Sequence, residues 1–215
     1  MNELLFLFQI LLIIIFALAA IRLGKSALIA WIAAQALIAN LFVLKQISLF
    51  GFNVTASDAF AIGGLLGLNF LQEYFGKEEA QKSTWICFFL MSFFVLVSQI
   101  HLNFIPSLYD DTQPSFLRIL SPSPRLLASS MLVFIIVQRL DIYFFAALKK
   151  MRPQMNFTFR AAICLVISQF LDTLLFSLIG LYGLVASLVD IILLSFMIKL
   201  IVIFLFTPFI RWAKI

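Results

Sequence analysis

Two stretches of the sequence each place an amide and a carboxylate within a long apolar segment. Gln138 precedes Asp141 by three residues, and Gln169 precedes Asp172 by three residues, so each pair shares one face of a helix. A carboxylate inside a bilayer is costly and usually either pairs with another group or takes part in function. We therefore interpret the two pairs as candidates for binding a polar ligand between two helices. An interhelical ion pair is the alternative explanation of Asp141.

Polar residues also occur in the apolar segments that precede these pairs. Asn69 and Glu73 are four residues apart and share a helix face, and Asn40 lies in an earlier segment. Glu73 is near the end of its segment, so an interfacial position is the alternative to a place in the protein interior. Gly63 and Gly67 form a small-xxx-small pair, which predicts close packing against a neighbouring helix.

Lys199 lies near the middle of the last apolar segment, where an ammonium group needs a partner. Asp190 is on the same segment but nine residues away, which places it on the opposite face of the helix. Lys199 must therefore reach another segment. The acidic candidates there are Asp172, Asp141 and Glu73.

The composition is that of a protein embedded in a membrane. Of the 215 residues, 64% are hydrophobic and 12% are charged, and Phe occurs 26 times. A span requires about 20 mostly apolar residues, so the chain consists almost entirely of spans and short connections. We expect a single transmembrane domain, residues 1–215. We expect neither a metal nor a cofactor, because one His and two Cys form no recognisable ligand set.

Seven apolar segments predict an all-α, polytopic transmembrane helical bundle. The expected spans are residues 4–22, 26–47, 55–75, 84–105, 124–148, 159–181 and 184–209. Basic residues concentrate in alternate connections and after the last span: Arg22, Lys25, Lys77, Lys82, Lys149, Lys150, Arg152, Arg160, Arg211 and Lys214. The opposite connections hold only Arg118 and Arg125. Because basic residues favour the cytoplasmic side, we expect the N-terminus outside and the C-terminus inside.

The longest external connection, 106–124, contains four prolines and two aspartates. Proline interrupts helices, so this connection is not expected to be helical throughout. A plain connector is one interpretation, and a lid over an external opening is the other.

Several of these residues lie in motifs that resemble the queuosine precursor transporter family. Residues 68–83, LNFLQEYFGKEEAQKS, resemble its signature of Thr-Asp followed by Glu-x-Tyr-Gly and a basic loop. Asp141 and Asp172 lie in segments that resemble its paired helices, SSMLVFIIVQRLDIYFF and SQFLDTLLF. Lys199 with Thr207-Pro208 resembles its last span. The order and spacing agree over residues 26–210, nearly the whole chain.

The resemblance implies a membrane transporter, and not an enzyme, that imports 7-deazaguanine precursors of queuosine, or queuine, for tRNA modification. It implies a six-span core, to which residues 4–22 add an N-terminal span without a role in the site. The family usually has Asp where this chain has Asn69, which removes a negative charge and indicates an altered ligand, such as free queuine. We expect the protein in the cell inner (cytoplasmic) membrane as a multi-pass protein.

A guanine-like base suits these polar residues, because it presents N–H donors beside a carbonyl acceptor. We hypothesise that Asp172 and Glu73, helped by Gln169, accept hydrogen bonds from the donor edge, and that Asn69 and Lys199 complete the polar wall. The candidate substrate-binding residues are Asn40, Asn69, Glu73, Gln138, Asp141, Gln169, Asp172 and Lys199.

Other functions stay open at this stage. The chain has no Walker motif, so a substrate-binding membrane subunit of an ATP-driven vitamin or nucleobase importer would need a separate ATPase. A structural protein, whose polar residues only hold helices together, and an intramembrane enzyme are further alternatives. The expected partners are a small-molecule substrate and membrane lipid, with no nucleic acid. A homodimer is left open, as is the choice between proton coupling and facilitated diffusion.

Overall fold

The computed structural model describes residues 1–155 and 157–209. Within these ranges some helical side chains lie outside the description: those of Ile62, Leu65, Asn69, Glu73, Lys77, Gln138, Asp141, Ile142, Phe145, Ala146 and Lys149, and those of segments 157–162 and 202–209.

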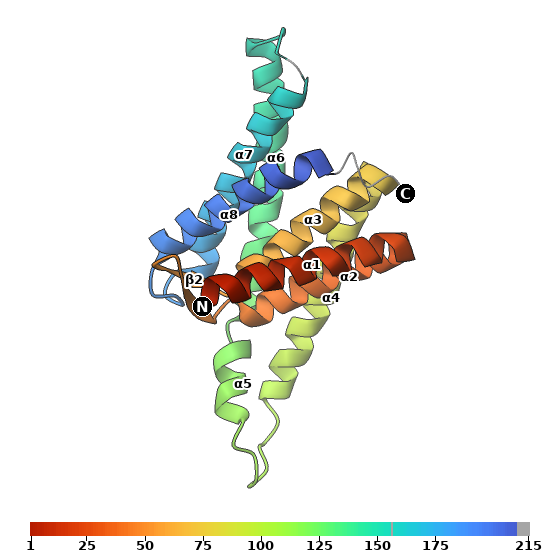
Figure 1. Cartoon of the computed structure of the whole chain (residues 1–215). Coiled ribbons are helices and arrows are strands. Elements are labelled where there is room, and N and C mark those ends of the chain that lie inside the picture. Colours follow the sequence, from red (N-terminus) through yellow and green to blue (C-terminus); the bar gives the residue numbers. More distant parts are fainter. Residues whose placement is uncertain (156, 210–215) are drawn as a thin grey trace.

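The described residues form eight α-helices, one π-helical turn and one β-hairpin (Figure 1). In chain order these are α1 (Asn2–Leu23), α2 (Lys25–Phe42), β1 (Gln46–Leu49), β2 (Phe52–Thr55), α3 (Asp58–Phe75), α4 (Lys77–Leu102), α5 (Gln113–Leu120), α6 (Ser123–Met151), α7 (Phe157–Phe176), η1 (Ser177–Leu181) and α8 (Leu188–Phe209). The predicted all-α helical bundle is therefore confirmed.

Several helices of the bundle are suited to a lipid environment. Among the described residues, five segments are long and apolar enough to cross a membrane: Asn2–Leu23, Lys25–Phe42, Glu78–Leu102, Gln113–Val137 and Ile163–Leu181. Large apolar side chains such as Leu4 and Phe89 are exposed on the outside of the bundle, where lipid tails would contact them. The count of seven spans and their orientation stay predictions.

The segment after α2 differs from the expected span. α2 ends at Phe42 rather than at residue 47, and residues 46–55 form an antiparallel β-hairpin instead of continuing the helix. Phe50 and Gly51 make the two-residue turn, with φ angles of 50° and 84°. Positive φ at both positions matches a type I′ turn, whose twist fits that of a hairpin. Polar and apolar residues alternate over much of this segment, which is a strand signal in the sequence itself.

The hairpin, residues 46–55, is called the hairpin cap here, because it lies over the start of α8 and the N-terminal end of α1 (Figure 1). Among the described residues, four hydrogen bonds join it to these helices and to the residues before α8: Asn2 Nδ2 donates to the Ser48 carbonyl at 2.9 Å, the Phe50 backbone N–H to Glu3 Oε1 at 3.2 Å, the Asn53 backbone N–H to Asp190 Oδ2 at 3.1 Å, and the Ala186 backbone N–H to Gln46 Oε1 at 3.0 Å. Two of its own side chains, Leu49 and Val54, are fully buried and pack against apolar residues of α1 and α8.

The two glycines singled out in α3 allow close helix packing. A Cβ atom at Gly67 would lie 2.6 Å from Ile32 Cγ1 on α2. One at Gly63 would lie 2.5 Å from Gln35 Oε1 on α2 and 2.8 Å from Ile13 Cγ2 on α1. A larger side chain at either glycine would therefore require these neighbouring side chains to move. The predicted role of the small-xxx-small pair is confirmed.

The connection at 106–124 is helical in part. α5 packs beside the end of α4, where Gln99 Nε2 donates to the Leu120 carbonyl at 2.9 Å and Gln113 Nε2 donates to the Leu102 carbonyl at 3.2 Å. α5 contributes none of the described residues that line the cavity presented below. This placement favours the connector interpretation over a lid.

Candidate functional site

A cavity of about 450 Å³ lies among α2, α3, α4, α6, α7 and α8. Its volume falls in the range of small-molecule sites, roughly 300–1,000 Å³. The polar residues described in its lining are Gln35, Asn40, Thr55, Ser57, Asp58, Thr84, Ser130, Gln169, Asp172, Thr173, Ser177, Ser195 and Lys199. The remainder is mostly apolar and includes the rings of Phe60, Phe88, Phe134 and Phe176. Such a lining suits a flat ligand with a polar edge.

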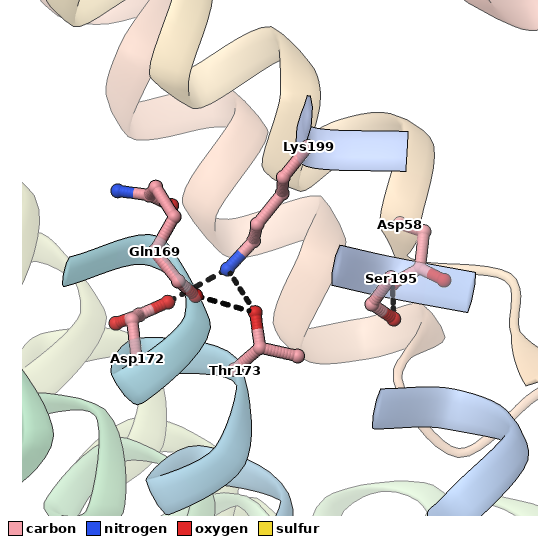
Figure 2. Close-up of polar contacts among 6 residues, drawn as sticks. All are labelled: Asp58, Gln169, Asp172, Thr173, Ser195 and Lys199. Atoms are coloured by element: carbon pink, nitrogen blue, oxygen red, sulfur yellow. Dashed lines mark hydrogen bonds and ion pairs between the residues drawn. The ribbon is translucent and has the colours of Figure 1, made fainter. Parts of the chain in front are cut away.

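An ion pair between α8 and α7 lies at the cavity wall. Lys199 Nζ donates to Asp172 Oδ2 at 2.7 Å and to Thr173 Oγ1 at 3.0 Å (Figure 2). The Thr173 hydroxyl in turn donates to the Gln169 carbonyl at 2.9 Å, one turn earlier in α7. The α7 backbone therefore orients the hydroxyl so that its oxygen accepts from the lysine. Both charged side chains line the cavity.

This pairing agrees with the expectation that Lys199 needs a partner other than Asp190. Asp190 accepts instead from the backbone of Asn53 in the hairpin cap. Asp172, one of the three acidic candidates, is the group within ion-pair distance of Lys199 among the described residues.

A second carboxylate reaches the cavity from the first residue of α3. Asp58 Oδ1 accepts a hydrogen bond from Ser195 Oγ at 2.8 Å, which links α3 to α8 (Figure 2). Ser195 and Lys199 are four residues apart, so α8 presents both on one face. Nearby, the hydroxyls of Thr55 and Ser57 are hydrogen-bonded to each other at 2.8 Å. The start of α3 and one face of α8 thus form a continuous polar wall.

Three buried oxygen atoms of residues that line the cavity have no hydrogen-bond partner among the described residues. They are Asp58 Oδ2, Gln35 Oε1 and Asn40 Oδ1. The Gln35 and Asn40 side chains come from α2 and are 2% and 7% exposed. Buried polar groups in proteins are nearly always hydrogen-bonded, because an unpaired one is destabilising. Acceptors left open around one cavity are therefore typical of a site that receives hydrogen-bond donors from a ligand.

The structure places half of the candidate residues and leaves the other half outside its description. Asn40, Gln169, Asp172 and Lys199 all line the cavity. Asn69 and Glu73 fall in α3, and Gln138 and Asp141 fall in α6, but their side chains lie outside the described residues. Their proposed contacts with the ligand stay predictions. α1 contributes none of the described lining residues.

Sequence reasoning missed Asp58 and Gln35. Asp58 lies inside the segment expected as a span, residues 55–75, so the rule that selected Asp172 applied to it as well. Gln35 lies inside the expected span 26–47 and is likewise a polar residue within an apolar helix. Both would have been found by treating every amide and carboxylate within a span as a candidate.

The fold and the cavity together define a class of protein. Apolar helices surround an internal cavity with an ion pair and open acceptors, and among the described residues no group of three His, Cys, Asp or Glu side chains could hold a metal ion. This is a multi-pass membrane protein with an internal cavity that is lined in part by polar and charged residues.

Comparison with known proteins identifies the family. Residues 55–213 match the family described as "Putative vitamin uptake transporter". A protein of Bacillus subtilis (strain 168) named "Probable queuosine precursor transporter" is 30% identical over 161 residues, which cover 74% of this chain and 70% of that protein. No solved structure matches the chain. The chain belongs to this family of membrane transporters, and the resemblance to queuosine precursor transporters is confirmed.

Proposed function

We propose that this transporter imports 7-deazaguanine precursors of queuosine, or queuine, and that the substrate binds in the cavity beside the Lys199–Asp172 pair. The name of the relative from Bacillus subtilis supports the substrate class. The observation that carries the proposal is the ion pair at the wall of a cavity with open acceptors. Family membership alone would fit many small molecules, whereas this arrangement favours one that presents both hydrogen-bond donors and an acceptor.

The chemistry of the cavity suits a 7-deazaguanine. Its base carries a ring N–H, an exocyclic amine and a carbonyl oxygen on one edge, so it needs acceptors and a donor close together. Carboxylate and amide oxygens are acceptors, and an ammonium group is a donor. The phenylalanine rings in the lining can stack on the faces of the flat base.

Transport would follow alternating access around the cavity, as in other transporters whose substrate site lies between helices. The α3–α8 and α7–α8 contacts are polar bridges across the cavity wall, and opening to either side would rearrange some of them. Two energy sources are compatible with this proposal. A buried carboxylate could carry a proton, or incorporation of the base into tRNA could draw in a substrate that diffuses through the protein.

The test is the queuosine content of tRNA in a bacterial host that can neither make nor import the precursors. The host expresses this chain, receives one compound at a time and carries a base-exchange enzyme able to use that compound. We expect modified tRNA at low external concentrations. The Asp172→Asn variant should reduce the modification at least about tenfold, the effect of losing one charged hydrogen bond.

Asp111→Asn is the matched control, because Asp111 is an exposed aspartate in the connection before α5 and lies away from the cavity lining. It should leave queuosine content unchanged. Absence of modification with every compound, with the protein demonstrably in the membrane, would reject the substrate class for the chain acting alone. That result would favour the membrane subunit of an ATP-driven importer, which would take up substrate once its ATPase partner is supplied.

A further inference from the structure

Asp58 is a carboxylate of the cavity lining with one buried oxygen that has no hydrogen-bond partner among the described residues. Its Oδ1 is bonded to Ser195 Oγ at 2.8 Å, whereas its Oδ2 is buried and has no hydrogen-bond partner among the described residues. Asp172 also has one oxygen bonded, Oδ2 to the Lys199 ammonium at 2.7 Å, but its charge is paired and its side chain is 37% exposed. A carboxylate held in place through one oxygen and open at the other is suited to receive a donor from a ligand.

The two open amides extend the same acceptor surface. Gln35 and Asn40 are almost fully buried and line the same cavity, and their side-chain oxygens, like Asp58 Oδ2, have no hydrogen-bond partner in the described part of the chain; the Gln35 oxygen lies beside Gly63 of α3. Leaving one such atom unpaired destabilises a protein, and leaving several around one space is unexpected unless something fills that space. The acceptors therefore point to an occupant with several hydrogen-bond donors.

Lys199 supplies the complementary group. An ammonium has three N–H donors, and Lys199 uses two of them, on Asp172 and Thr173. Among the described side chains Lys199 has no third acceptor, so one donor is left for a ligand acceptor. Because Ser195 positions Asp58 and lies one turn before Lys199 on α8, the open acceptor and the open donor are held by the same helix face. The Lys199 ammonium is directed to α7 and Asp58 lies beside Ser195 (Figure 2), so a ligand that meets both must present its donor and its carbonyl to two parts of the cavity wall.

We propose that Asp58 Oδ2 accepts a hydrogen bond from the exocyclic 2-amino group of a 7-deazaguanine, while Lys199 donates to its carbonyl oxygen. This assignment rests on the proposed function and makes Asp58 a residue that determines specificity. Asp172 then acts as a positioning residue, which fixes Lys199. A site built to pair with a substrate N–H rejects an analogue without it, since the buried acceptor would stay unpaired.

The test measures equilibrium binding to the purified full chain in lipid nanodiscs. The probes are 7-deazaguanine and 7-deazahypoxanthine, which has the same ring system without the 2-amino group. We expect the wild-type chain to bind 7-deazaguanine at least about tenfold more tightly, the effect of one hydrogen bond to a charged group. Asp58→Asn preserves the shape but turns one oxygen into a donor, so this preference should largely disappear. Asp190→Asn, an aspartate outside the cavity lining, should retain it.

The possible failures are distinguishable. Equal binding of the two compounds by the wild-type chain would overturn the role of Asp58 without any variant, so the test does not depend on how the variants fold. A preference that persists in Asp58→Asn would overturn it too, and in both cases the proposed function stands. If the wild-type chain binds neither compound nor queuine, the substrate class is wrong and the assignment fails with it.

Discussion

The cavity and the hairpin cap contain the same kinds of polar side chain but differ in how those side chains are partnered. Where the cap meets α8, Gln46 of the cap and Asp190 of α8 each accept a hydrogen bond from a backbone N–H, close to the bundle surface. In the cavity, Gln35, Asn40 and Asp58 each have a buried oxygen that no described residue pairs. A group near the surface can also bond to water, so its pairing is a matter of structure, whereas a buried one depends on the protein or on a ligand. Among the described residues, buried polar atoms without a partner also occur at Trp31, Ser83 and Ser123, but the unpaired buried carboxylate and amide oxygens belong to residues of the cavity lining.

We expect the largest effect on the cavity from removing its ammonium group. Lys199→Met leaves Asp172 without its partner and the proposed ligand without its donor. We expect at least about a tenfold loss of uptake and a loss of about 1–3 kcal/mol in the free energy of unfolding. Uptake of labelled substrate into cells and thermal unfolding in detergent measure the two effects.

A double variant separates binding from helix packing. In Asp172→Leu with Lys199→Met, both charges are gone, and replacement of an internal ion pair by apolar residues is often tolerated. Stability should largely recover while uptake stays low. Wild-type uptake by this double variant would mean that the pair only holds α7 against α8, as the structural-protein alternative requires.

Two neighbouring glycines test how closely α3 must approach α2. In Gly63→Ala the new Cβ would lie 2.5 Å from Gln35 Oε1 and 2.8 Å from Ile13 Cγ2, so the neighbours must move. We expect a loss of about 1–3 kcal/mol, as for other overpacked sites, and weaker substrate binding, because Gln35 lines the cavity. Gly64→Ala is the control for stability, since its Cβ would meet nothing within 4 Å; it is no control for binding, because Gly64 also lines the cavity. Equal melting temperatures of the two variants would contradict the close packing.

In the hairpin cap, loss of one polar contact should have a smaller and purely structural effect. Asp190→Asn weakens the bond from the Asn53 backbone N–H, which is 3.1 Å long. We expect a destabilisation of roughly 0.5–1 kcal/mol and no change in the concentration dependence of uptake. A changed affinity for substrate would contradict the view that polar contacts of the cap are structural and those of the cavity bind the substrate.

The smallest expected effect is at the turn of the cap. Phe50 has a φ of 50° and its side chain is 62% exposed, and Asn adopts this conformation more easily than Phe. Phe50→Asn should therefore stabilise the protein by a few tenths of a kcal/mol, up to about 1 kcal/mol. Differential scanning calorimetry in detergent would detect the shift, and a lower melting temperature would show that the ring contributes more than the turn conformation does.

Much of the fold followed from local sequence patterns. Long apolar segments predicted a helical membrane bundle, and the spacing of Gly63 and Gly67 predicted close helix packing. These inferences succeed because hydropathy and helical periodicity act along a single segment. The hairpin cap was missed, although its residues alternate, because the same residues are apolar enough to extend a neighbouring span.

For the site, the sequence could exclude a partner of Lys199, but only the tertiary structure could identify one. The sequence alone excluded Asp190 as the partner of Lys199, since nine residues of helix turn the two side chains to opposite faces. The choice of Asp172 required the packing of α7 against α8, and the part played by Asp58 required the contact between α3 and Ser195. Which polar groups stay open inside a membrane protein depends on which helices meet, because any partner for a buried group must come from a distant part of the chain.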